Sequence, residues 1–205
     1  MRIELKIQKA IEEAIITLPN KGGCGVLVNG NIIVTAAHCV QINLSGEMAI
    51  LDQSLDTIDT RHQGTIKAKI LFVELVNDIA LLGAADYQDS YSDCEKYKEY
   101  CNHTKAIQIC SDDFETQKEY EAYVSYRGKL IKIKHQKVNP DAQCHWFETE
   151  EIMGPGMSGS PIVNPKGELI GVLSHSSSDT DNINGKFSLI TTTLPDYFLK
   201  QIGVK

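Results

Sequence analysis

The sequence contains no hydrophobic run long enough to cross a membrane, because none approaches the ~20 residues that a bilayer-spanning helix needs. It also contains little cysteine, six residues among 205, well below the content of a disulfide-held scaffold. The N-terminal segment lacks the apolar core of roughly 7–15 residues and the small-residue cleavage site of a secretory signal peptide. We therefore expect no membrane partner, a cytoplasmic location and mostly free thiols.

Basic residues are not in excess either. Twenty Lys and Arg stand against 27 Asp and Glu, which gives a formal net charge of −7. Nucleic-acid binders usually carry a basic balance, so we expect no nucleic-acid partner. Fifteen glycines and six prolines are too few for a collagen-like or low-complexity chain. The length suits a globular protein with one domain or two small ones.

The first segment of the chain has the periodicity of an amphipathic helix. Between residues 2 and 18, apolar side chains recur at steps of three and four, which places them on one helical face. They are Ile3, Ile7, Ile11, Ala14, Ile15 and Leu18. Pro19 and Asn20 end the run, so we assign residues 1–20 to an N-terminal helix that packs on the body of the protein. A regulatory partner that binds this helix is the alternative interpretation.

After residue 20 the helical period disappears and short apolar runs alternate with turn residues. Asn29-Gly30-Asn31 lies between the first two runs and is typical of a β-hairpin. The predicted strands are 26–28, 32–35, 48–51, 65–73, 79–82, 105–110, 120–126, 129–134, 144–149, 161–164, 168–174 and 186–192. The polar stretch 86–103 is predicted to be a connection, and Pro195 begins a short C-terminal helix. This pattern indicates an antiparallel barrel or sandwich.

Three segments contain the residue types of nucleophilic catalysis: 35–39 (TAAHC), 77–82 (NDIALL) and 154–161 (GPGMSGSP). A serine hydroxyl needs an adjacent base at neutral pH. An imidazole can be that base, and a buried carboxylate can orient it. Glycines beside the serine let backbone N–H groups face a developing oxyanion. Each segment alone is more often structural, whereas their joint occurrence in the order His, Asp, Ser indicates a hydrolytic site.

The three motifs resemble those of the chymotrypsin-like (trypsin-like) serine peptidases, over roughly residues 21–203. The pattern is closest to bacterial and HtrA-like members, here without a PDZ domain. An α/β-hydrolase would have the order Ser, Asp, His and a glycine where Ser160 stands. The resemblance implies an all-β fold of two antiparallel six-stranded barrels with the N-terminal and C-terminal helices added. The first barrel would span 21–90, and 91–205 would hold the connection, the second barrel and the C-terminal helix.

The resemblance also implies a role for each motif. His38 would be the general base, Asp78 its orienting carboxylate, and Ser158 the nucleophile that forms an acyl-enzyme. The N–H groups of Gly156 and Ser158 would form the oxyanion hole. The activity would be that of a serine endopeptidase acting on polypeptides without a cofactor or metal. An inactive protease-fold binding module and an esterase using the same site remain alternatives, and the complete triad favours the endopeptidase.

By the same resemblance, Ile152 lies at the base of the primary substrate pocket and Leu173, Ser174 and His175 form one wall. Ser174 resembles the family serine that contacts the triad aspartate and lies beside the substrate backbone. Trypsin-type members carry an aspartate where Ile152 stands. We expect an apolar side chain before the scissile bond, because burial of an unpaired cation is costly.

Two other preferences stay open. Glu150, Glu151 or Asp179 would restore a basic preference if one of them reached the pocket. His175 would favour an acidic side chain if it contacted the substrate.

Two features depart from the secreted members of the family. Those mature by freeing an Ile-Val-Gly-Gly-like N-terminus that pairs with an aspartate just before the nucleophile. Here Met157 occupies that position and no such motif precedes the first barrel, so we expect no such activation switch. Cys24 lies one residue away from the usual disulfide partner of Cys39, which leaves a bridge between them open.

A zinc site is the remaining alternative for the cysteines in the middle of the chain. The spacing of Cys94, Cys101, His103 and Cys110 matches none of the common short-spaced zinc motifs. We therefore expect isolated thiols there and no metal.

Overall fold

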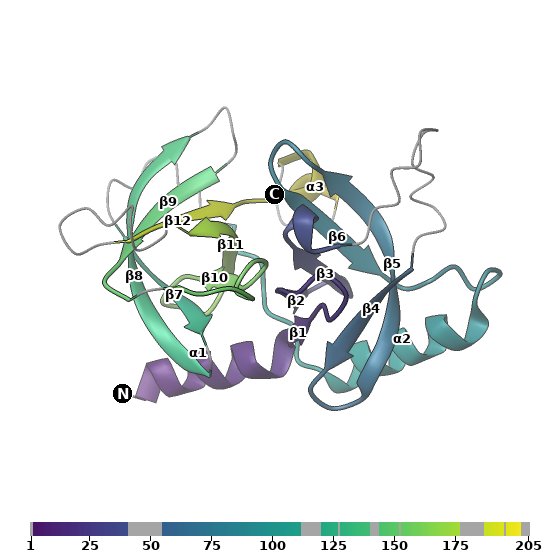
Figure 1. Ribbon diagram of the computed structural model, residues 1–205. Helices are drawn as coiled ribbons and strands as arrows, with labels where there is room; N and C mark the ends of the chain where they lie inside the picture. The colour runs from purple at the N-terminus through teal and green to yellow at the C-terminus, as the bar shows by residue number, and fades with distance from the viewer. Residues whose placement is uncertain are drawn as a thin grey trace.

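The computed structural model describes residues 2–40, 55–111, 120–126, 128–139, 144–151, 153–176, 187–194 and 196–201. Within these residues the strands form two closed antiparallel barrels, which lie side by side in Figure 1. The first contains β1 (Ile15–Thr17), β2 (Cys24–Val28), β3 (Ile32–Thr35), β4 (Leu55–Thr60), β5 (Gly64–Glu74) and β6 (Ile79–Gly83). The second contains β7 (Glu121–Tyr126), β8 (Lys129–Asn139), β9 (Cys144–Thr149), β10 (Pro161–Val163), β11 (Leu169–Ser176) and β12 (Phe187–Thr192). The predicted fold class is confirmed.

Both barrels have the same strand order. Around the first the order is β1-β2-β3-β6-β5-β4, and around the second it is β7-β8-β9-β12-β11-β10. Each barrel surrounds its own apolar side chains, such as Leu27, Ile33 and Ile58 in the first and Val124 and Phe147 in the second. The two halves are therefore topological copies, although they share no repeat that is visible in the sequence.

The N-terminal helix is shorter than its periodicity predicts. Helix α1 runs over Arg2–Ala14, and the next three residues form β1, which pairs with both β2 and β4. Ile7 and Ile11 are buried as expected. Ile15 and Ile16 are β-branched and complete the first barrel, so strand pairing overrides the helical period at this point.

Strand β4 was not predicted, and the predicted strand 48–51 lies outside the described residues. The inward positions of β4 are Asp56, Ile58 and Thr60, so apolar and polar residues share the buried face. Asp56 Oδ1 accepts hydrogen bonds from Asn20 Nδ2 at 3.1 Å and from the N–H of Thr57 at 2.8 Å. Because these buried polar groups have hydrogen-bond partners, β4 can place polar residues at two of its three inward positions. The sequence of β4 therefore lacks the alternation of apolar and polar residues that would have predicted a strand.

The segment 86–103 lies between the last strand of the first barrel and the first strand of the second, as predicted for a connection, but it contains a helix that was not predicted. Helix α2 occupies Tyr91–His103 and packs against the first barrel, with Cys94, Tyr97, Tyr100 and Cys101 on its buried face. The Tyr97 hydroxyl donates to the Asn31 carbonyl at 3.1 Å. The segment 105–110, predicted as a strand, contributes only isolated parallel bridges at Ile107 and Ile109.

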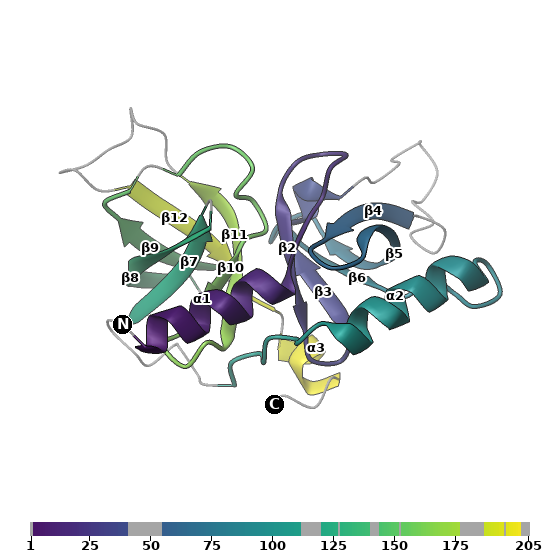
Figure 2. The same cartoon turned by 90° about the horizontal axis from the view of Figure 1, so that it is seen from below.

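The terminal helices connect the two barrels. Figure 2 shows α1 beneath the second barrel with its C-terminal end at the first, and Gln8 Nε2 donates to the Gly128 carbonyl in the β7–β8 turn at 2.7 Å. Helix α3 (Asp196–Gln201) follows the second barrel, yet Leu199 joins the apolar cluster of the first. The rings of Tyr197 and Phe72 lie 6.2 Å apart. None of the helices in the described ranges is long and apolar enough to cross a membrane.

Candidate active site

The first barrel brings His38 and Asp78 together at one end. His38 lies in a short 3-10 helix, Ala37–Cys39, that begins two residues after β3 ends. Asp78 immediately precedes β6 and has a left-handed backbone, with φ of 51°, which Asp adopts more readily than most residues. The Ala37 N–H donates to the Asp78 carbonyl at 3.2 Å. The neighbouring strands β3 and β6 therefore position the two side chains against each other.

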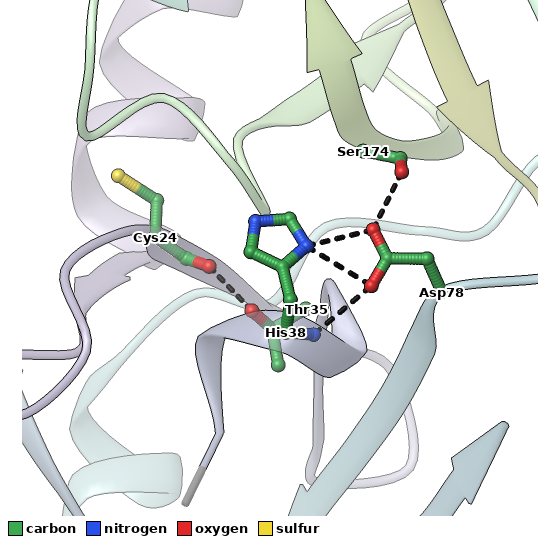
Figure 3. Close-up of polar contacts among 5 residues, drawn as sticks. All are labelled: Cys24, Thr35, His38, Asp78 and Ser174. Atoms are coloured by element: carbon green, nitrogen blue, oxygen red, sulfur yellow. Dashed lines mark hydrogen bonds and ion pairs between the residues drawn. The ribbon is translucent and has the colours of Figure 1, made fainter. Parts of the chain in front are cut away.

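The Asp78 carboxylate orients the His38 ring, as Figure 3 shows. His38 Nδ1 lies 2.8 Å from Asp78 Oδ2 and 3.0 Å from Oδ1, and the backbone N–H of His38 donates to Oδ1 at 2.9 Å. A carboxylate only accepts, so Nδ1 is assigned as the N–H donor and Nε2 as the acceptor. This tautomer presents a basic nitrogen away from Asp78. The His38 side chain is 49% exposed and that of Asp78 22%, so the imidazole remains accessible while the carboxylate is more enclosed.

Ser174 adds a further donor from the second barrel. Its hydroxyl donates to Asp78 Oδ2 at 2.5 Å. The carboxylate thus receives hydrogen bonds from the His38 ring, the His38 backbone and the Ser174 hydroxyl. This contact crosses the barrel interface, and it couples the position of Asp78 to strand β11.

Backbone hydrogen bonds from both barrels hold the loop that carries Ser158. The Cys24 N–H, at the start of β2, donates to the Ser158 carbonyl at 2.7 Å. The Gly159 N–H donates to the Leu173 carbonyl at 2.6 Å, and the Ser160 N–H to the Met157 carbonyl at 2.9 Å. The nucleophile candidate therefore lies where the two barrels meet, on a turn that the main chain fixes.

Two glycines of this turn have left-handed backbones for different reasons. Gly159 has φ of 80°, and a Cβ there would collide with the Cys24 carbonyl oxygen and with Thr35 Oγ1. Gly156 has φ of 88° but open space around it. Gly159 is thus required by close packing, and Gly156 by conformation alone.

The N–H groups of Gly156 and Ser158 have no backbone acceptor within the described residues, so they are available to a negative oxygen. Among the residues that the structure describes, no hydrogen bond joins the Ser158 hydroxyl to His38. Burial, and next the Asp78 carboxylate, raise the pKa of the Cys39 thiol to about 12, so it stays protonated. Catalytic hydrogen bonds are often long before substrate binds.

A cavity of about 280 Å³ adjoins Ser158. Of the residues predicted to form the substrate pocket, Leu173, Ser174 and His175 line it, and Ile152 lies outside the described residues. Met153 and Met157 also line the cavity. Both are buried in the apolar cluster of the second barrel, and neither was predicted as a pocket residue. Their signal in the sequence was weak, since a methionine beside glycines fits a turn as well as a pocket.

Charged side chains are absent from the described lining of that cavity. Glu150 and Glu151 are exposed and line a different hollow, together with Lys132 and Lys134 of β8. Asp179 lies outside the described residues. The described walls offer only apolar surface, hydroxyls and the exposed imidazole of His175 to a substrate side chain.

The cysteines are free thiols, Cys24 and Cys39 included. Cys24 Sγ donates weakly to the Gly156 carbonyl at 3.4 Å. Cys94 and Cys101 face the first barrel from α2, whereas Cys110 Sγ accepts from Asn164 Nδ2 at 3.3 Å near β10. No group of three or more His, Cys, Asp or Glu side chains suited to a metal ion occurs in the parts of the chain that the structure describes.

The sequence matches the family model of the trypsin-like peptidase domain over residues 23–172. This match covers well over half of the chain. The chain therefore belongs to the trypsin-like peptidase domain family. It is a serine endopeptidase of the chymotrypsin-like class.

Solved structures of serine proteases have a similar fold. The active form of the Rv3671c protease from M. tuberculosis superimposes with a TM-score of 0.59 at 13% identity, covering 97% of this chain and 85% of that one. A serine protease of a human pathogenic astrovirus gives 0.53 at 17% identity, covering 91% and 92%. At these identities the likeness concerns the fold. No curated protein sequence matches the chain significantly.

Proposed function

We propose that this endopeptidase cleaves its substrates through an acyl-enzyme on Ser158, with His38 as general base and Asp78 as the orienting carboxylate. The observation that carries the proposal is the hydrogen-bonded set of His38, Asp78 and Ser174 beside the Ser158 turn. His38 Nε2 would take the proton of the Ser158 hydroxyl as that oxygen attacks the scissile carbonyl. The resulting imidazolium would be stabilised by Asp78.

The tetrahedral oxyanion would be bound by the N–H groups of Gly156 and Ser158. Donors already aimed at the developing charge lower the barrier because they need no reorganisation. His38 would then protonate the leaving amine. Water, activated by the same imidazole, would hydrolyse the Ser158 ester and return the hydroxyl.

For the residue before the scissile bond we propose an apolar side chain of small or medium size. The cavity beside Ser158 has Leu173, Met153 and Met157 in its walls and no charged side chain in its described lining. A Lys or Arg side chain would lose its hydration there without a counter-charge. A library of peptides varied at this one position tests the preference, and dominant cleavage after Lys or Arg would contradict it.

Labelling with a fluorophosphonate tests the nucleophile directly. We expect one label, on Ser158, and loss of both label and peptide hydrolysis in Ser158→Ala with an unchanged fold by circular dichroism. Ser90→Ala, at the start of α2 and away from the site, is the matched control and should keep both. Full hydrolysis by Ser158→Ala would exclude Ser158 as the nucleophile.

The two alternatives give different results in the same assays. A binding module would hold a peptide without cleaving it and would take no label. An esterase would turn over an ester but not the matched amide. The hydrogen-bonded His38–Asp78 pair favours the peptidase over both, because amide cleavage requires a base that later protonates a poor leaving group.

A regulatory partner on the N-terminal helix and a cytoplasmic location stay predictions. Ile7, Ile11 and Ala14 of α1 are buried against the protein itself, so such a partner would bind the outer face, where Leu5 is 61% exposed. The six free thiols support a reducing compartment. Cell fractionation and affinity capture with an α1 peptide as competitor would test the two predictions.

A further inference from the structure

A second cavity, of about 510 Å³, lies on the other side of the Ser158 turn. Pro155, Gly156 and Met157 line both this cavity and the one beside Ser158. Most of its remaining walls come from α1, from β1, β2 and β4 of the first barrel, and from the end of β7 with the turn that follows it. The predicted oxyanion donor Gly156 therefore separates two adjoining hollows, and the assigned roles use only one of them.

The position of the second cavity relative to His38 indicates which part of a substrate would bind in that cavity. Figure 3 shows Cys24 and Ser174 on opposite sides of the His38 ring. Ser174 lines the cavity assigned to the residue before the scissile bond, and Cys24 lines the second one. A peptide bound across Ser158 thus passes from the Ser174 side to the Cys24 side. Its next residues, each advancing the chain by about 3.3 Å, enter the second cavity.

The charges around this cavity are unequal. Glu12 of α1 accepts from Gln8 at 2.9 Å through Oε1 and pairs with Arg61 at 3.2 Å through Oε2. Asp59, on β4, accepts from the Thr65 hydroxyl at 2.6 Å through Oδ1. Its other oxygen has no partner within the described residues. Arg61 pairs with Glu12, so Asp59 is the carboxylate in the cavity lining for which the described residues show no ion pair.

Part of the cavity wall is apolar. Ile15, Met157 and the ring of Tyr126 contribute to it. A Lys or Arg side chain fits such a site, because its aliphatic stem covers apolar surface while its charged end reaches a carboxylate at the rim. An acidic side chain would face Asp59 and would find Arg61 already paired.

We infer that this cavity binds the substrate segment after the scissile bond and that Asp59 makes it prefer a Lys or Arg side chain there. The inference rests on the proposed function of Ser158. It assigns a specificity role to the first barrel and to helix α1, whose Glu12 lines the cavity. The partner it defines is a polypeptide with an apolar residue before the cleaved bond and a basic residue within the next three.

The inference is tested with internally quenched peptides that share the same residues before the scissile bond and differ after it. Each of the three positions after the scissile bond carries Lys, Ala or Glu in turn, and kcat/KM is measured. We expect Lys to exceed Ala, and Ala to exceed Glu, by about two- to fivefold at one position, as for a partly exposed ion pair. The preference should shrink in high salt.

Three variants locate the preference. Asp59→Asn keeps the size of the side chain and should remove the advantage of Lys. Arg61→Gln removes the ion-pair partner of Glu12 and should increase the advantage of Lys. Asp89→Asn removes the same charge from an exposed position outside the cavity and should leave it unchanged. The opposite signs of the first two effects cannot come from partial unfolding.

A substrate that ends in an anilide has no residues after the scissile bond and separates this inference from the proposed function. Wild type and Asp59→Asn should cleave it equally. Equal rates for Lys, Ala and Glu peptides with normal anilide hydrolysis would overturn the inference alone, as would a Lys preference that survives Asp59→Asn. Failure to cleave any substrate would overturn the proposed function and the inference with it.

Discussion

The two barrels have the same strand order but contribute to the site in different ways. The first supplies His38 and Asp78, whose side chains are joined by hydrogen bonds and completed by Ser174. The second supplies the Ser158 turn, which is held through backbone N–H and carbonyl groups. One half is organised by side-chain chemistry and the other by main-chain geometry. Substitutions should therefore damage the two halves by different mechanisms.

The largest effect is expected at the centre of the first half. His38→Ala removes the proposed base and should lower kcat by about 10⁴-fold or more, and Asp78→Asn should lower it by about 10⁴-fold because the ring would lose its orienting acceptor. Both variants should unfold near the wild-type midpoint, because both positions lie at the end of the barrel. Hydrolysis of a peptide with an apolar residue before the cleaved bond is the measurement, and a tenfold loss or less would contradict the assignment.

The next largest effect tests the main-chain half. Gly159→Ala introduces a Cβ that collides with the Cys24 carbonyl at a backbone with φ of 80°. It should lower the free energy of unfolding by more than about 2 kcal/mol and displace Ser158. Gly156→Ala adds only the conformational strain of its positive φ, about 1 kcal/mol. Denaturant unfolding of the pair measures the difference, and equal losses would show that close packing at Gly159 is not the cause.

A smaller effect is expected where the two halves meet. Ser174→Ala removes the donor to Asp78 Oδ2 while His38 keeps its contacts with the carboxylate. We expect about a tenfold loss of kcat, the value of one hydrogen bond to a charged group. Ser174→Thr keeps a hydroxyl and should recover part of the loss. A kcat equal to wild type in Ser174→Ala would mean that Asp78 is oriented by the first barrel alone.

The last prediction concerns the pH dependence of stability, which should differ between the two barrels. His145 lies in the second barrel, with its Nδ1 3.3 Å from His135 Nε2 and 3.1 Å from the Tyr120 hydroxyl. Burial, and then His135, lower the pKa of His145 to about 4. Between pH 6.5 and 4 the unfolded chain therefore binds a proton that the folded protein does not. The free energy of unfolding should therefore decrease as the pH is lowered through this window, by up to about 1.4 kcal/mol per pH unit.

The single tryptophan makes this prediction measurable, because Trp146 is in β9 of the same barrel. Unfolding followed by its fluorescence should show the acid loss in wild type and a flatter pH dependence in His145→Gln. His62→Gln, at an exposed position between β4 and β5, is the control and should keep the wild-type dependence. An equal slope in all three proteins would exclude His145 as the origin.

Much of this fold was predictable from the sequence because the hydrophobic pattern is regular in most strands. The hairpin around Asn29-Gly30-Asn31 and the strands from β7 to β12 overlap their predicted ranges, although β8 continues to Asn139 instead of ending at residue 134. The pattern failed where buried positions are polar or where aromatic residues replace aliphatic ones. Asp56 and Thr60 occupy buried positions of β4, so this strand lacks an apolar alternation in the sequence. Tyr97 and Tyr100 form part of the buried face of α2 within an otherwise polar stretch. In α2 the spacing of Cys94, Tyr97 and Cys101 was the signal that could have revealed a helix.

The sequence by itself determined which residues were candidates for the chemistry, because a histidine after a strand, an aspartate before one and a serine among glycines are local patterns. Only the tertiary structure decided which of them touch. The Ser174–Asp78 contact spans 96 residues along the chain, and the cavity around Asp59 joins α1, β4 and the Ser158 turn. Such contacts depend on the closure and relative placement of the two barrels, which no local pattern specifies, because strand pairing is set by long-range packing.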